Sequence, residues 1–185
     1  MLRKIAILLA VFASLMFSAT VFAKETKTAA EPFPLIEGYG TVKPMPATSP
    51  PVSKYKIYKV IFDVSKGNDP DEVNSGLEAV AQAVNAFASA GVSKKNLKFV
   101  VVIHGDATPI VISGGGYNTR FHVANPNNDL ISKLNAVGVQ MLVDGQSLIE
   151  HQIEGAEVNS NISETLSAPS TLVIYEQHKY QLYMP

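Results

Sequence analysis

The run LKFVVVI, residues 97–103, decides the fold that this sequence predicts. All of its residues except Lys98 are apolar, and most of them are β-branched or aromatic, which favours a strand. Consecutive apolar positions bury both faces of a strand, and strands of that kind are typical of parallel sheets that helices cover. The run therefore predicts a central strand of an α/β domain.

A helix is predicted before this strand, and another strand before that helix. YKIYKVIFDV, residues 55–64, is rich in β-branched and aromatic residues. Asp69, Pro70 and Glu72 fit the N-cap, N1 and N3 positions of a helix. Apolar residues then recur at spacings of three and four, and Gly91 stands where a glycine that ends the helix is expected.

The rest of the chain continues the alternation of strands and helices. The predicted elements are a turn and helix start at 125–127, a strand at 139–143, a short helix around 147–151, a weaker strand at 158–162, a helix beginning at 167–169 and a short strand at 180–184. Such alternation favours a mainly parallel sheet with helices on both faces. The 185 residues, 46% of them hydrophobic, suffice for one domain with a sizeable core.

The first 23 residues have the physical features of a secretory signal peptide. Arg3 and Lys4 supply the positive start, and residues 5–17 form an apolar stretch too short for comfortable membrane spanning. Val21 and Ala23 place small residues before a cleavage site. We expect cleavage after Ala23, a periplasmic or secreted mature protein, and no membrane attachment afterwards.

Residues 24–54 are predicted to form a proline-rich arm, and residues 55–185 the domain. The arm cannot be a helix or a central strand, because proline removes backbone donors and fixes φ. Its prolines are Pro32, Pro34, Pro44, Pro46, Pro50 and Pro51. Its apolar residues, which exceed what a free linker needs, are Phe33, Leu35, Ile36, Tyr39 and Val42. We expect the arm to lie on the domain or on a neighbouring subunit.

Charge and cysteine content exclude several classes of function. Without residues 1–23 the chain keeps 13 basic and 16 acidic residues, and Lys94-Lys95, its paired lysines, fit a solvated loop. No basic patch for nucleic acid is therefore predicted. The cysteine count of zero excludes disulfides and any thiol nucleophile.

Polar residues follow the predicted strands at the edge where ligands bind to open parallel sheets. These segments are Ser65-Lys66-Gly67, His104-Gly105-Asp106 and Asp144-Gly145-Gln146. If the strands before His104 and Asp144 are neighbours, the two side chains face one another across the crevice. A carboxylate beside an imidazole suits acid–base work or metal ligation. The alternative is that His104 is a structural residue that bonds a backbone carbonyl, and both interpretations stay open.

Other motifs give little support for catalysis. Gly114-Gly115-Gly116 lacks the Lys-Ser/Thr of a phosphate loop and is interpreted as a flexible loop. His122, His151 and His178 show no metal-ligand spacing, and no GxSxG motif is present. We assign no catalytic residue, no metal and no cofactor.

Several ordered blocks resemble the DsrE/DsrF-like family, in particular its exported single-domain members. The blocks are YKVIFDV at 58–64, VVIHG at 101–105, NPN at 125–127, VDGQ at 143–146 and LSA at 166–168. The resemblance covers roughly residues 55–185. It implies a three-layer α/β/α sandwich with a five-stranded, mainly parallel sheet, and assembly into a homo-oligomer, a trimer or a hexamer.

The resemblance also implies where a site would lie, and shows a departure. Sulfur-relay members carry a cysteine that passes on a persulfide, and related exported proteins have Cys-Gly-Gln where this chain has Asp144-Gly145-Gln146. A carboxylate cannot hold a sulfane sulfur. We therefore expect an oligomeric binding or accessory protein without sulfurtransferase activity. The alternatives are a metal- or anion-binding module, or an acid–base enzyme that uses His104 and Asp144. The candidate ligand-binding residues are His104, Gly105, Asn125, Asp144, Gly145 and Gln146.

Overall fold

The computed structural model describes residues 34–43, 45 and 50–185, so the predicted signal peptide and part of the arm lie outside the described residues. Its five strands are β1 (Tyr58–Val64), β2 (Leu97–Ile103), β3 (Gln140–Asp144), β4 (Ile162–Thr165) and β5 (Gln181–Tyr183). They form one sheet in the order β4-β3-β2-β1-β5, and every neighbouring pair is parallel. The predicted parallel sheet with LKFVVVI at its centre is confirmed.

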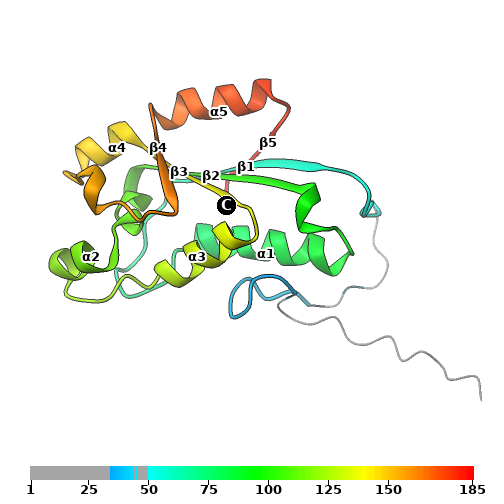
Figure 1. The fold of residues 1–185 in the computed structure, drawn as a ribbon, viewed down its shortest axis with the longest axis horizontal. Helices are drawn as coiled ribbons and strands as arrows, with labels where there is room; N and C mark the ends of the chain where they lie inside the picture. Colours follow the sequence, from blue (N-terminus) through cyan, green and yellow to red (C-terminus); the bar gives the residue numbers. More distant parts are fainter. Residues whose placement is uncertain (1–33, 44, 46–49) are drawn as a thin grey trace, which may run out of the picture.

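Helices cover both faces of this sheet (Figure 1). The α-helices are α1 (Ser75–Ser89), α2 (Gly114–Phe121), α3 (Asn128–Ala136), α4 (Gly145–Glu150) and α5 (Ala168–Gln177). Three short 3₁₀ segments are η1 (Lys94–Asn96), η2 (Gly105–Val111) and η3 (Gly155–Glu157). Figure 1 shows α1 and α3 on one side of the sheet and α5 on the other. The three-layer α/β/α architecture is therefore present.

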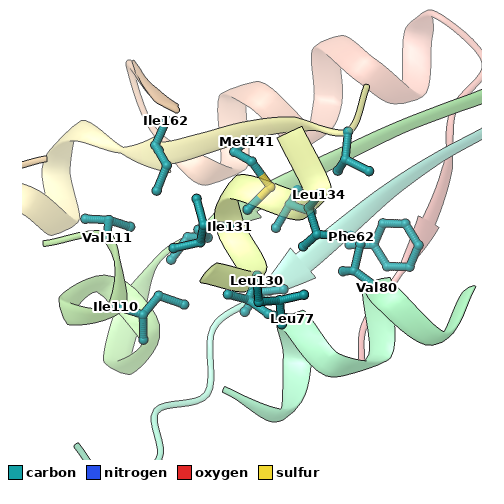
Figure 2. Packing of buried hydrophobic residues seen from close by; sticks show 14 of the residues in the cluster. Phe62, Leu77, Val80, Ile110, Val111, Leu130, Ile131, Leu134, Met141 and Ile162 are labelled. Atoms are coloured by element: carbon teal, nitrogen blue, oxygen red, sulfur yellow. The ribbon is translucent and has the colours of Figure 1, made fainter. Parts of the chain in front are cut away.

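The larger part of the hydrophobic core lies between the sheet and the α1/α3 layer. Figure 2 shows Phe62 of β1, Val80 of α1 and Leu134 of α3 within this cluster, with Met141 of β3 beside them. A smaller cluster on the other face packs beneath α5; it consists of Ile61, Val100, Val102, Leu142 and Ala168. Residues of β2 enter both clusters, because alternate side chains of a strand point to opposite faces.

Helix α1 begins later than the sequence predicts. Its N-cap is the buried Asn74, whose side-chain oxygen accepts hydrogen bonds from the N–H groups of Gly76 (2.9 Å) and Leu77 (3.3 Å). The backbone N–H of Asn74 is itself bound by the side chain of Asn127, at 2.8 Å. The predicted cap, Asp69, instead lies in a turn closed by the N–H of Glu72. The contact with Asn127, distant in sequence, fixes the true start.

The glycine triplet is also different from the prediction, because it forms the first turn of α2 rather than a flexible loop. The helix is anchored by Tyr117, which is buried and donates a hydrogen bond to the carbonyl of Pro70 at 2.8 Å. At its other end, Arg120 pairs with Glu157 at 3.0 Å. These tertiary contacts supply what the helix propensity of the glycines does not.

The described part of the arm packs on its own domain. Asn85 of α1 is fully buried, and its side-chain oxygen accepts hydrogen bonds from the N–H groups of Leu35 (3.2 Å) and Ile36 (2.9 Å). Its amide nitrogen donates to the carbonyls of Ile36, Tyr39 and Gly40. Ile36 is fully buried in the main core. Of the two expected arrangements, residues 34–43 adopt the one on the domain.

Within the residues that the structure describes, no helix is both long enough and apolar enough to cross a membrane.

Candidate functional site

The carboxyl ends of β1, β2 and β3 bring the predicted site segments to one edge of the sheet. The register pairs Ile103 of β2 with Val64 of β1 and with Val143 of β3. His104 and Asp144 therefore follow matching positions on adjacent strands, as the sequence analysis required. The side chains, however, have other partners.

His104 pairs with Asp63, through a contact between Nε2 of the imidazole and Oδ1 of the carboxylate. Asp63 lies between Phe62 and Val64, which face the main core, so its side chain lies on the opposite face of β1, the α5 side. The two side chains are 26% and 15% exposed, respectively. They form a partly buried acid–base pair that remains open to solvent.

Asp144 is engaged by backbone groups instead of by His104. Its Oδ1 accepts hydrogen bonds from the N–H groups of Gln146 (2.7 Å) and Ser147 (3.3 Å), which makes it the N-cap of α4. Its Oδ2 accepts a hydrogen bond from the N–H of Ala168, the first residue of α5, at 2.9 Å. Asp144 is only 5% exposed. The predicted pairing of His104 with Asp144 is therefore corrected: His104 pairs with Asp63. The Asp144 carboxylate instead accepts hydrogen bonds from the N–H groups at the starts of α4 and α5.

The two glycines of the candidate site have steric reasons to be glycine. Gly105 has φ +54, which disfavours residues with a Cβ, and its N–H donates to Oγ of Ser147 at 3.2 Å. A Cβ on Gly145 would lie 2.7 Å from the carbonyl oxygen of Thr165. Both glycines allow the loops after β2 and β3 to pack tightly against neighbouring segments.

The remaining candidates differ in accessibility. Gln146 is exposed at the strand ends, and its side-chain amide lies 3.5 Å from the carbonyl of Leu166. Asn125 is buried, and its amide nitrogen donates to the carbonyls of Ile110 (2.8 Å) and Ile112 (2.7 Å). Its oxygen accepts from the N–H of Asn127 at 2.9 Å. Asn125 therefore holds the segment before α3, and its polar atoms are already used.

Two features of the site were missed by sequence reasoning. Asp63 is the side chain that pairs with His104, and the signal for it was a carboxylate inside the otherwise apolar end of β1, IFDV. Thr165 stands opposite Asp144 in the pairing of β3 with β4, and its Oγ1 is buried without a hydrogen-bond partner. Neither neighbour can be found from the sequence alone, because each depends on which strands pair and in which register.

The chemistry available at this edge is proton transfer and polar recognition. A histidine oriented by a carboxylate can accept or donate a proton. No set of three or more histidine, cysteine, aspartate or glutamate side chains suited to a metal ion occurs among the described residues. The chain has no cysteine to act as a thiol nucleophile.

Comparisons with known proteins agree on the family and the fold. The sequence model of the DsrE/DsrF-like family matches residues 59–182, which is more than half of the chain. Among solved structures, the protein of unknown function MTH1491 from Methanobacterium thermoautotrophicum is similar in fold, with a TM-score of 0.54 and 14% sequence identity. The similarity covers 69% of this chain and 99% of that protein. No curated protein matches this chain.

Proposed function

The chain belongs to the DsrE/DsrF-like family, a family related to sulfur relay, and from that premise we propose that it is a binding or accessory protein without persulfide chemistry. It acts as a homo-oligomer, a trimer or hexamer, in the periplasm or after secretion. The strand-end segments carrying His104, Gly105, Gln146 and their neighbours form its recognition surface. Its partner recognises the fold of the family rather than a transferable sulfur atom.

The observation that carries this proposal is the burial and hydrogen bonding of the Asp144 side chain. The resemblance places the persulfide-carrying cysteine of exported relatives at this position. Here the side chain is a carboxylate whose oxygens hold the first turns of α4 and α5. A sulfur carrier needs an accessible thiolate, and this chain has neither a thiol nor an accessible group at that position.

Cyanolysis tests the absence of sulfur transfer. The purified protein is incubated with a sulfane-sulfur donor, washed and treated with cyanide, next to a cysteine-free unrelated protein. We expect no thiocyanate above that control. Clear release from this chain would contradict the proposal, because it would require a sulfur carrier other than cysteine.

The proposed location rests on residues 1–23. Arg3-Lys4, the apolar stretch and the small residues before Lys24 support export and cleavage after Ala23. Intact-mass analysis of the periplasmic fraction should find a mature N-terminus at Lys24. Retention of Met1 in the exported pool would refute the cleavage.

Oligomerisation is supported by apolar residues left exposed on the α5 side. Leu166 is 76% exposed, and Val173 and Ile174 of α5 are each 52% exposed. Leu166 and Ile174 line one shallow hollow, and exposed apolar side chains that lie together in this way are typical of interaction sites. The arm gives weaker support than the sequence suggested, since Ile36 is buried within its own chain.

Sedimentation velocity tests the oligomer. We expect a mass of three or six chains, lowered by Ile174→Glu and unchanged by Gln177→Glu at the exposed end of the same helix. A concentration-independent monomer for the unmodified protein would overturn this part of the proposal.

A second candidate function follows from the pair of His104 and Asp63. The pair is partly exposed at the edge where parallel sheets bind ligands, so an acid–base enzyme or an anion-binding module remains an alternative. Native mass spectrometry of the protein isolated from cells distinguishes this alternative from the accessory function proposed above. A small molecule retained by the unmodified protein and lost from His104→Ala favours this alternative, and identical spectra oppose it.

A further inference from the structure

A hollow of the domain lies beside α1, and none of the candidate residues His104, Gly105, Asn125, Asp144, Gly145 and Gln146 lines it. It is a cavity of about 560 Å³, within the range typical of small-molecule sites. Its walls come from the arm at residues 41–43 and 45, from α1, from β1 and β2, and from the end of β5. Because five separate segments line it, the cavity is concave on one side and open to solvent on the other, unlike the exposed surface of α5.

The sheet side of the cavity is aromatic and rigid. Phe62 and Phe99 are buried and meet edge to face with ring centroids 5.3 Å apart. Phe87 of α1 lies 5.8 Å from Phe99, and Tyr183 of β5 lies 5.6 Å from Phe62. Tyr183 reaches this face because the register pairs it with Phe62. Half of the Tyr183 side chain stays exposed, so this ring forms the rim.

The helix side of the cavity owes its space to small residues. Ala79, Ala83 and Ala86 follow one another at spacings of four and three, which places them on one face of α1. Larger side chains at these positions would fill the gap between the helix and the sheet. Gln82 also lines the cavity, and its amide donates to the carbonyl of Thr41 at 3.4 Å, which ties the helix to the arm.

The charge of the described cavity lining is positive. Among the described residues that line the cavity, Lys43 is the sole charged side chain, and none of them is a carboxylate. It is exposed, so its ammonium group reaches the solvent side of an otherwise apolar site. An apolar body in contact with the aromatic wall, with an anionic head near Lys43, complements this arrangement.

We propose that this cavity binds an amphipathic carboxylate with an unbranched apolar tail, of the size of a medium-chain fatty acid. The inference does not rest on the proposed function, because neither His104 nor Asp144 nor their neighbours at the candidate site line the cavity. The result of the cyanolysis test for sulfur transfer therefore does not decide whether this cavity binds a carboxylate. A second copy of the chain is the competing occupant, and the experiment below separates the two.

Decanoate is the probe, and decanol is its uncharged counterpart. Binding of each is measured by calorimetry on the protein isolated from cells that express the full chain, and NMR locates the decanoate site. Ala86→Trp fills the cavity from an exposed position of α1, and Ala90→Trp, at the exposed end of the same helix, is the matched control. Lys43→Gln removes the charge without touching the core.

We expect saturable decanoate binding, with NMR chemical-shift changes centred on Phe87, Phe99 and Tyr183. Ala86→Trp should weaken it at least tenfold, while Ala90→Trp stays within twofold. Lys43→Gln should weaken decanoate at least threefold and leave decanol unchanged. The proposal is overturned by a lack of saturable decanoate binding, by equal affinity in Ala86→Trp, or by equal losses for decanoate and decanol in Lys43→Gln. A lower sedimentation mass in Ala86→Trp, without decanoate binding in the unmodified protein, would assign the cavity to a second copy instead.

Discussion

The carboxylate of Asp144 joins the end of β3 to the start of α5, because its Oδ2 accepts a hydrogen bond from the backbone N–H of Ala168 at 2.9 Å. Its Oδ1 simultaneously caps α4. One buried side chain thus satisfies the start of α4, which follows it directly, and the start of α5, 24 residues further along the chain. The carboxylate at position 144 therefore has a structural role in this chain.

Removing that carboxylate should destabilise the protein strongly. We expect Asp144→Ala to lower the free energy of unfolding by about 2–4 kcal/mol, from the lost N-cap and the unpaired N–H of Ala168. Asp144→Asn should also destabilise, because one of the two accepting oxygens becomes an amide NH2, which donates and cannot accept, so one helix start loses its acceptor. Urea denaturation provides the measurement, with Asp106→Asn at an exposed carboxylate as the control. A loss no larger than that of the control would show that the caps contribute little.

The same burial predicts the behaviour of a thiol placed there. In Asp144→Cys, we expect slow alkylation by iodoacetamide in the native protein and fast alkylation in urea, because the position is nearly inaccessible. Ser65→Cys, at the partly exposed end of β1, serves as the accessible comparison. Native labelling at the same rate for both thiols would mean that position 144 opens to solvent and lines a site.

A double-mutant cycle should find that His104 is coupled to Asp63. We expect a coupling free energy of about 1 kcal/mol for His104→Ala with Asp63→Asn, since the two side chains are in direct contact. The cycle of His104→Ala with Asp144→Asn should give less than about 0.5 kcal/mol. Thermal or urea unfolding of each set of variants measures both values. The reverse order of the two couplings would restore the pairing that the sequence suggested.

Asn85 should prove essential for holding the arm. Its side chain makes five hydrogen bonds to backbone groups of four residues within 35–40, and all of these would be lost in Asn85→Ala. We expect a loss of about 2 kcal/mol or more, because each buried group left unpaired carries a penalty. Limited proteolysis should then cut the arm faster than in the unmodified protein. Asn135→Ala, at an exposed asparagine of α3, is the control, and equal cleavage rates in the two variants would refute the clamp.

The pair of Arg120 and Glu157 predicts a pH effect on stability. The hydrogen bond from the N–H of Glu154, helped by Arg120, holds the pKa of the Glu157 carboxyl below its ordinary value of 4.5. A lowered folded pKa stabilises the fold above that ordinary value, and the contribution is lost as pH falls through the folded pKa. Glu157→Gln should therefore flatten the fall in melting temperature between about pH 5 and pH 3, whereas Glu150→Gln should not. Parallel profiles for Glu157→Gln and the unmodified protein would contradict this.

Much of the fold could be predicted because the patterns are local. The apolar run of β2 has the bounds that the sequence indicates, and Ser167 caps α5 as Ser167-Ala168-Pro169 predicts. The positive φ of Gly91 marks the helix end that was expected there. The start of α1 was wrong, because Asp69 and Asn74 both satisfy a local capping pattern. A contact with Asn127, 53 residues away, selects Asn74.

The sequence by itself determined the elements, their alternation, the absence of a thiol and the segments that reach the carboxyl edge of the sheet. These properties follow from residue type and spacing along the chain. Only the tertiary structure decided which side chains meet there. His104 follows β2, which lies between β1 and β3, and each of these two strands carries an aspartate near the same edge of the sheet. Asp144 accepts hydrogen bonds from N–H groups at the starts of α4 and α5, of which those of Ser147 and Ala168 are buried, and Asp63 is then the partner of His104.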